Sequence, residues 1–230
     1  GFGQNQRPSQ YPVDQNAVIV AARRLASAPY QSRAGNLPAG LDNLRADQYR
    51  DIRFSDAAAV WGKDGLQFRL GLLAAGFYFQ SPVNISLVDK GVSQELQTNP
   101  GMFEVGPSVP AAIAKIALPL SGFSVSNRLN SRTVWDEFIR FQGASYFRAR
   151  AKGQIYGLAA RALTVNIAEP QGEEFPAFTQ FWITKPEPKS EDLTVDALLD
   201  SPSVTGAYHF VIHPGVETTV DVDAMLFART

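Results

Sequence analysis

The sequence contains no cysteine among its 230 residues. Disulfide bonds, thiolate nucleophiles and cysteine-based metal sites are therefore excluded, although many exported proteins also lack cysteine and the compartment stays open. Histidine is nearly as rare, with two residues. The net charge of −1 gives no basic field to hold nucleic acid or an anionic membrane surface, so we expect neither as a partner.

Long apolar runs are also missing. The longest, Leu70–Phe79, contains two glycines and is shorter than the roughly 18 residues that span a membrane. The first ten residues lack the basic and apolar regions of a signal peptide. Their Gln, Asn, Pro and Ser content predicts a flexible tail over residues 1–11. Phosphate-loop, dinucleotide-binding and nucleophile-elbow patterns are absent too, and nothing calls for a cofactor.

What the chain does contain points to a β-rich core. Hydrophobic residues make up 45% of the sequence, and 15 phenylalanines and 7 tyrosines favour strands. One segment instead has helical periodicity, residues 14–28. Asp14 is a suitable N-cap, Val13 is placed to pack on Val18, and Pro29 ends the helix.

From Leu66 onwards apolar residues recur with a period of two, which predicts strands. The expected strands span residues 66–72, 83–87, 113–118, 144–150, 163–167, 181–184, 193–198, 207–212 and 218–222. Two short helical turns are expected at 45–49 and 56–60. Many short strands separated by turn residues indicate an all-β sandwich or barrel. Without a repeat or a linker, residues 12–230 are assigned to one domain.

The stretch Gly143–Gly215 contains the residues that suggest a binding site. Aromatic, acidic, arginine and glycine residues are interleaved along it at strand-like spacing. Aromatic rings suit the flat C–H faces of a sugar, whereas carboxylates and guanidinium groups suit its hydroxyl rims. The candidate sugar-binding residues are Tyr146, Arg148, Tyr156, Arg161, Glu173, Glu174, Trp182 and Asp200.

Several of these candidates have a plainer interpretation. Glu173 and Glu174 lie in a Gly-Glu-Glu-Phe-Pro loop and form either a cleft wall or two solvated charges. The arginines either bind hydroxyls or pair with Asp200 or Glu173 in a structural network. Asp200, which precedes Ser201-Pro202, also fits an Asx turn.

Two further pairs of residues are weaker candidates for a functional site. His209 and His213 form an H-x3-H pattern, but in a strand they lie about 13 Å apart, too far for one zinc ion, so we expect no metal site. Asp221 and Asp223 share a strand face about 7 Å apart, a separation that also occurs in inverting glycosidases. Plain alternation is the favoured interpretation, because two acids on one strand approach a sugar from one side.

Six segments in order also resemble one family. They are NLPAGL (36–41), QYRDIRF (48–54), GASYFR (143–148), GQIYGLAARAL (153–163), GEEFPAFTQFWI (172–183) and LLDSPSVTGAYHF (198–210). The chain resembles the osmoregulated periplasmic glucan biosynthesis proteins of the G and D type. The resemblance implies a large two-layer β-sandwich of the supersandwich kind, similar to galactose mutarotase-like domains. It also implies that the chain covers only the N-terminal portion of this sandwich, and that the family's C-terminal immunoglobulin-like domain is absent.

The resemblance implies a periplasmic protein that binds and modifies β-1,2-linked glucan. Hydrolysis would need a general acid and a base; by family analogy we expect these carboxylates after Thr230, so the catalytic residues stay unknown. The alternative is a non-catalytic scaffold that holds glucan for the inner-membrane glucosyltransferase. A mutarotase-like activity rests on the fold alone. A sandwich cut within its sheets exposes strand edges, so we expect a second copy, another chain or a missing segment to complete it.

Overall fold

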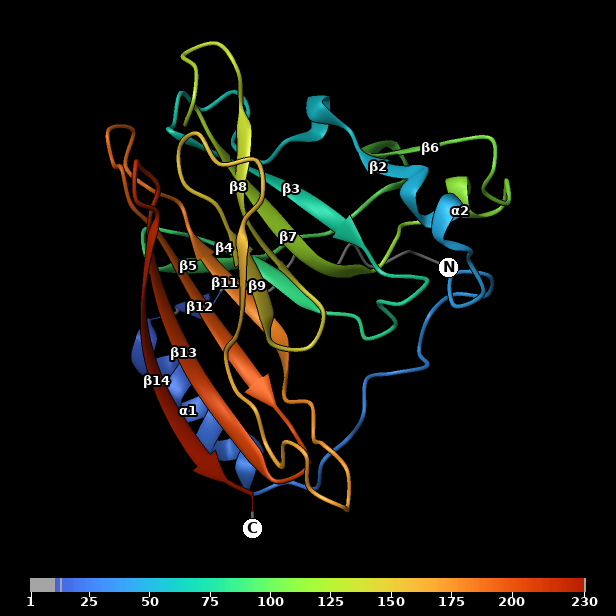
Figure 1. Ribbon diagram of the computed structural model, residues 1–230, viewed down its shortest axis with the longest axis vertical. Coiled ribbons are helices and arrows are strands. Elements are labelled where there is room, and N and C mark those ends of the chain that lie inside the picture. The colour runs from blue at the N-terminus through green and yellow to red at the C-terminus, as the bar shows by residue number, and fades with distance from the viewer. Residues whose placement is uncertain (1–10, 13, 230) are drawn as a thin grey trace, which may run out of the picture.

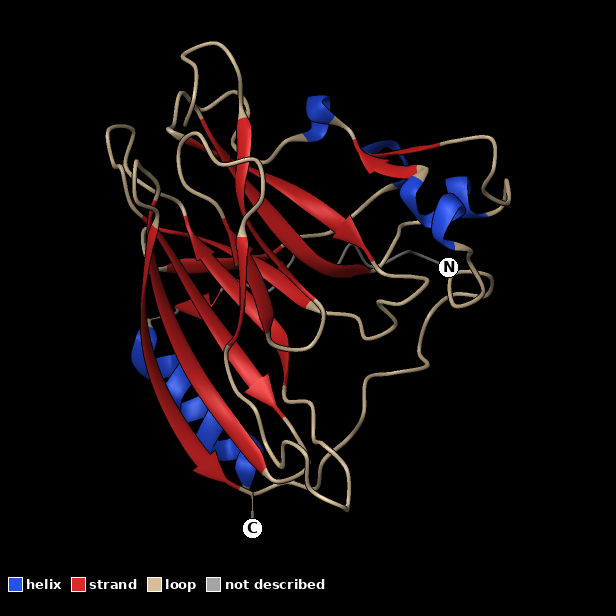
Figure 2. Ribbon diagram, in the orientation of Figure 1, coloured by secondary structure: helices blue, strands red, loops and turns tan. Residues whose placement is uncertain are grey.

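The computed structural model describes residues 11–12 and 14–229 and forms a β-sandwich with one main helix (Figures 1 and 2). The all-β fold class is thereby confirmed. One sheet has seven strands in the order β1-β5-β4-β11-β12-β13-β14. These strands span Tyr11–Pro12, Val92–Glu95, Asn84–Asp89, Ala177–Thr184, Leu193–Asp200, Val204–His213 and Thr219–Ala228. Neighbours are antiparallel except β4 and β11, which pair in parallel.

The second large sheet has five antiparallel strands in the order β10-β9-β8-β7-β3. They span Leu158–Arg161, Tyr146–Ala149, Asp136–Gln142, Leu120–Asn127 and Phe68–Ala74. The core lies between the two large sheets and is rich in phenylalanine. Phe141 stacks on Phe123 with ring centroids 5.1 Å apart, and Phe210 meets Phe141 edge-on at 5.2 Å. Such contacts add about 0.5–1.5 kcal/mol per pair beyond area burial.

Helix α1 (Gln15–Ala26) covers the outer face of the seven-stranded sheet (Figure 1). As predicted, Asp14 is the N-cap, and its Oδ1 accepts a hydrogen bond from Ala17 N at 2.8 Å. Val18 and Ala22 are buried against the sheet. The expected packing of Val13 lies outside the described residues, as does the expected tail except for Tyr11, which belongs to β1.

A small two-stranded sheet lies beside β3, over the outer face of the five-stranded sheet. It pairs β2 (Ile52–Phe54) with β6 (Phe103–Val105) and follows helix α2 (Ala46–Arg50). Tyr49 Oη donates to Ala74 O at 2.6 Å and fixes α2 to the end of β3. Single 3₁₀ turns occur at Asp56–Ala58, Pro100–Met102 and Ile113–Lys115. The two predicted helical turns are therefore confirmed. None of the helices in the described ranges has the length and apolar content to cross a bilayer.

Two predicted strands are wrong. Residues 113–118 contain the 3₁₀ turn Ile113–Lys115, whose first amide donates to Pro110 O at 2.9 Å. Residues 163–167 contribute one bridge, between Val165 and Glu174, because Asn166 has a φ of 54° and leaves the extended region.

Strands β1, β2, β5, β6, β7, β8 and β10 were not predicted, and β7 and β8 are the longest of them. In β7, serine and glycine occupy alternate positions and resemble turn residues. In β8, two acids open the strand, and a register shift opposite Val125 and Ser126 places the adjacent Phe138 and Ile139 both in the core. The simple alternation that marks a half-buried strand is lost there.

Candidate functional site

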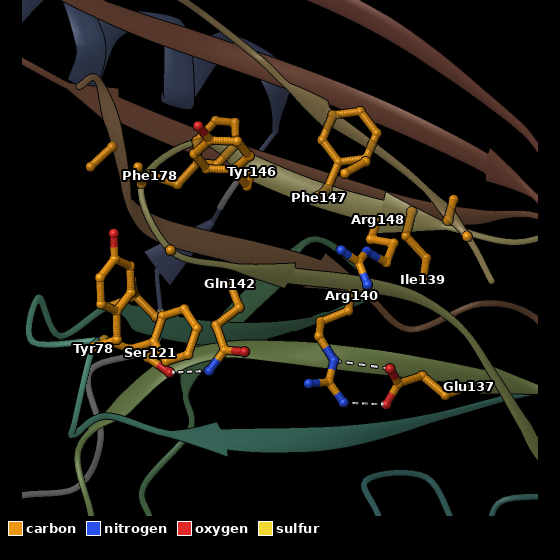
Figure 3. Close-up of a pocket in the computed structure, with 18 of the residues that line it drawn as sticks. Tyr78, Ser121, Glu137, Ile139, Arg140, Gln142, Tyr146, Phe147, Arg148 and Phe178 are labelled. Atoms are coloured by element: carbon orange, nitrogen blue, oxygen red, sulfur yellow. Dashed lines mark hydrogen bonds and ion pairs between the residues drawn. The ribbon is translucent and has the colours of Figure 1, made fainter. Parts of the chain in front are cut away.

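A cavity of about 960 Å³ lies at the exposed end of the five-stranded sheet. Its lining comes from β8, β9, the 155–157 segment before β10, the 78–83 loop, and residues 175–181 (Figure 3). Apolar side chains from the margin of the core reach it, including Ile139, Phe147, Phe178 and Phe181. Its volume lies at the upper end of the range typical of ligand pockets.

The polar wall follows from strand alternation. On β8, Arg140 and Gln142 alternate with the core residues Ile139 and Phe141, and Arg140 pairs in register with Arg148 of β9. These side chains therefore share the sheet face that points away from the core. Figure 3 shows Arg140 and Arg148 extending from adjacent strands into the cavity.

Two members of this wall are fixed by hydrogen bonds. Arg140 donates from Nε and Nη2 to the two oxygens of Glu137, each at 2.9 Å. Gln142 Nε2 donates to Tyr49 Oη at 2.9 Å and to Ser121 Oγ at 3.0 Å. The orientation of the wall thus does not depend on a ligand.

Aromatic rings line the mouth. Tyr78 and Tyr156 are 83% and 87% exposed, and Tyr146 is 41% exposed. Phe79 lies under Tyr78, with ring centroids 5.9 Å apart. Gly143 permits this arrangement: its φ is +79°, and a Cβ there would lie 3.1 Å from the Phe79 ring.

Arg161 and Glu173 form the rim behind these rings. Arg161 Nη2 lies 2.6 Å from Glu173 Oε1, and both side chains are mostly buried. The Arg161 guanidinium also lies over the rings of Tyr146 and Phe175, 5.4 and 5.7 Å from their centroids. Of the predicted residues, Tyr146, Arg148 and Tyr156 line the cavity, and Arg161 and Glu173 support it.

Glu174 lies elsewhere, although it is the next residue in the chain. Its carboxylate accepts hydrogen bonds from Ser201 Oγ, from Ser203 N at 2.9 Å and from Ser203 Oγ at 2.8 Å. Burial raises the pKa of this carboxyl, but the hydrogen bonds from Ser201 and Ser203 outweigh it and leave the pKa below its ordinary value. Glu174 therefore holds the turn between β12 and β13.

Asp200 and Trp182 also lie away from the cavity. Asp200 pairs with Arg229, and Arg229 donates to the carbonyl oxygens of Leu25 and Ala28 at the end of α1. The predicted network paired arginines of the 146–161 region with Asp200 or Glu173; Arg161 does pair with Glu173, but the partner of Asp200 is Arg229, which was not predicted. Trp182 is 8% exposed and packs beneath α1. Its place on β11 alternates with Phe181, so it faces the helix and not the cavity.

The histidines are held individually by acids on neighbouring strands. His209 Nδ1 lies 2.7 Å from Asp196 Oδ1, and His213 lies 2.6 Å from Asp192 and 3.1 Å from Asp221. The two histidines lie on β13, as predicted. Across residues 14–229, no group of three or more histidine, aspartate and glutamate side chains could hold a metal ion.

Sequence reasoning missed Glu137, Arg140, Gln142 and Tyr78. The first three belong to β8, which was not predicted, so their shared face could not be assigned. The alternation of Ile139, Arg140, Phe141 and Gln142 was the available signal. Tyr78 lies in an aromatic triplet that was assigned to an apolar run.

The sequence matches one protein family along nearly its whole length. Residues 13–230 match the family described as "Periplasmic glucan biosynthesis protein, MdoG". The chain is 45% identical over 216 residues to "Glucans biosynthesis protein G" of Shewanella sp. (strain MR-4), covering 94% of this chain and 40% of that protein. "Glucans biosynthesis protein G 1" of Shewanella oneidensis is similar to the same extent, and the Shewanella baltica (strain OS155) protein is 44% identical over the same coverage. The chain thus spans about 40% of the length of these relatives.

Proposed function

The chain belongs to the periplasmic glucan biosynthesis family, and on that premise we propose that its cavity binds a β-1,2-linked glucan backbone in the periplasm. The observation that carries this proposal is the composition of the cavity wall. Tyr78, Tyr146 and Tyr156 offer ring faces at its mouth. Within it, Arg140 offers N–H donors held in place by Glu137, and Gln142, whose Nε2 is engaged by Tyr49 and Ser121, offers its Oε1 as an acceptor. Sugars need both kinds of partner.

A binding role suits this chain better than hydrolysis. Of the lining residues in the described part of the chain, Glu137 is the sole carboxylate, and Arg140 engages both of its oxygens. Glycoside hydrolysis in most families needs two carboxyl groups on either side of the scissile bond. We therefore propose that this chain holds the glucan for catalytic groups elsewhere, either in a longer protein or in a partner glucosyltransferase.

Titration calorimetry with linear β-1,2-glucooligosaccharides tests the proposal, with β-1,4-linked cellohexaose as the comparison ligand. We expect binding of the β-1,2-linked ligand and weaker binding of the β-1,4-linked one. Tyr146→Ala removes a ring at the mouth, and we expect its affinity to fall by about five- to tenfold. A reducing-end assay on the same samples reports hydrolysis.

Tyr30→Ala is the matched control. Tyr30 is 40% exposed and lies 5.7 Å from the Arg229 guanidinium, as Tyr146 is 41% exposed and 5.4 Å from Arg161, but Tyr30 does not line the cavity. Equal losses of affinity in the two variants, or no binding by the unaltered protein, would refute the proposal. New reducing ends would show that the protein supplies a catalytic acid and base beyond Glu137.

A further inference from the structure

Three arginines line the cavity, and they differ in how their charge is compensated. Arg140 is held by Glu137 through two hydrogen bonds of 2.9 Å. Arg150 lies 3.6 Å from Asp136. Arg148, in contrast, has no ion pair and no side-chain hydrogen bond with any residue between 14 and 229. The cavity wall therefore carries one positive charge that no neighbouring acid neutralises, in a chain whose net charge is −1.

Arg148 is an exposed residue of β9 and faces a second arginine across the strand pair. Arg148 lies directly opposite Arg140 in the register of β8 and β9. Like charges placed directly opposite each other on neighbouring strands destabilise the pair. The pairing of β8 with β9 therefore gains nothing from a guanidinium at position 148, and this group stays exposed at the cavity.

The backbone nevertheless holds the stem of Arg148 in place. Gly157, just before β10, lies so close that a Cβ there would be 2.5 Å from Ala149 O and 3.0 Å from Arg148 Cγ. Only glycine fits this approach, and it confines the aliphatic part of Arg148. Arg150 adds a second unsatisfied donor, because its Nε is buried and has no hydrogen-bond partner.

We propose that Arg148, together with Arg140, forms an anion subsite in this cavity for a carboxyl or phosphoryl group carried on the sugar chain. The proposal rests on the proposed function, since the anion arrives on the glucan. The planar guanidinium fork matches the oxygens of carboxylate and phosphate in two parallel hydrogen bonds. Neutral hydroxyl groups satisfy such donors less well, because hydrogen bonds between charged groups are the stronger ones.

The test measures binding to the full-length protein by calorimetry with three probes: a neutral β-1,2-glucooligosaccharide, the same oligosaccharide carboxymethylated once per chain on average, and inorganic phosphate. We expect the carboxymethylated probe to bind about tenfold more tightly than the neutral one. Added salt should reduce this preference, because the site is open to solvent. If inorganic phosphate binds as tightly as the carboxymethylated probe, the site serves a free anion and the proposal is overturned.

Arg148→Gln should abolish the preference, so that the two oligosaccharides bind alike. Arg132→Gln is the control, since Arg132 is an exposed arginine in the β7–β8 loop outside the cavity lining, and it should keep the preference. A ratio that survives in Arg148→Gln overturns the subsite. So does equal binding of both oligosaccharides by the unaltered protein, which leaves glucan binding intact. Binding of neither oligosaccharide overturns the proposed function as well.

Discussion

The outer face of the seven-stranded sheet is covered by α1, whereas the outer face of the five-stranded sheet is open at β8 and β9 (Figure 1). On the covered face, polar side chains are engaged within the protein: Asp200 with Arg229, and Thr205 Oγ1 with Ala22 O at 2.7 Å. On the open face, Tyr146 and Arg148 face a cavity. Residue type alone does not mark a binding site; what covers the strand face decides it.

The largest effect is expected on stability, from a substitution on the covered face. Trp182→Ala removes a side chain packed between β11 and α1, and we expect the free energy of unfolding to fall by about 3–5 kcal/mol. Urea unfolding followed by circular dichroism measures this loss. Glucan affinity of the folded protein should be unchanged. Normal stability with lost binding would instead place Trp182 in the binding site.

The next effect concerns the turn that Glu174 holds. Glu174→Ala removes hydrogen bonds from Ser201 and Ser203 to a charged group, and we expect a loss of about 2 kcal/mol near neutral pH. The folded-state pKa of Glu174 is lowered, so its contribution is present above the unfolded pKa and is lost as pH falls through the folded pKa. The difference between unaltered and variant protein should therefore shrink on acidification. Glu169→Ala, at an exposed glutamate, should show neither effect.

The sequence could predict the sandwich because short apolar runs between turn residues mark β3, β4, β9 and β11–β14. It could predict α1 because Asp14 and Pro29 bound an amphipathic segment. It could not separate the two neighbouring acids Glu173 and Glu174. Adjacent residues leave a strand or loop in opposite directions, and one reaches Arg161 while the other reaches Ser203. Which of the two side chains lies near the cavity depends on residues far apart in the chain.

The same dependence on residues far apart in the chain explains why the surroundings of other site residues could not be predicted. Arg148 was identified from the Tyr146–Arg150 alternation, but its partner Arg140 was missed, because the register shift in β8 hides the alternation. Asp200 was open to two interpretations until Arg229, 29 residues later, was placed beside it. Pairings across strands are tertiary facts that local patterns do not contain.

A smaller effect on stability and binding is expected for a substitution on the open face. Gly143→Ala forces an alanine into a φ of +79° and against the Phe79 ring. We expect a loss of about 1–2 kcal/mol in stability and weaker glucan binding, because Phe79 lines the cavity. Gly35→Ala is matched, with a φ of +84° and no atom within 4 Å, so it should lose stability alone. Equal binding by the two variants would argue against a role for Phe79.

The smallest expected effect lies on the covered sheet, beside the end of β13. Hydrogen bonding to Asp192, with a further contribution from Asp221, raises the pKa of His213 above its ordinary value. A raised folded-state pKa gives stability that is fully present below the unfolded pKa of about 6.5 and is lost as pH rises through the folded pKa. Because these side chains are largely solvent-exposed, the contribution should be on the order of 0.5 kcal/mol. His213→Gln should therefore be less stable than the unaltered protein near pH 5 and equally stable near pH 9, and about 1 M salt should reduce the difference. Unfolding curves with the same pH dependence in both proteins would show that these ion pairs contribute nothing measurable.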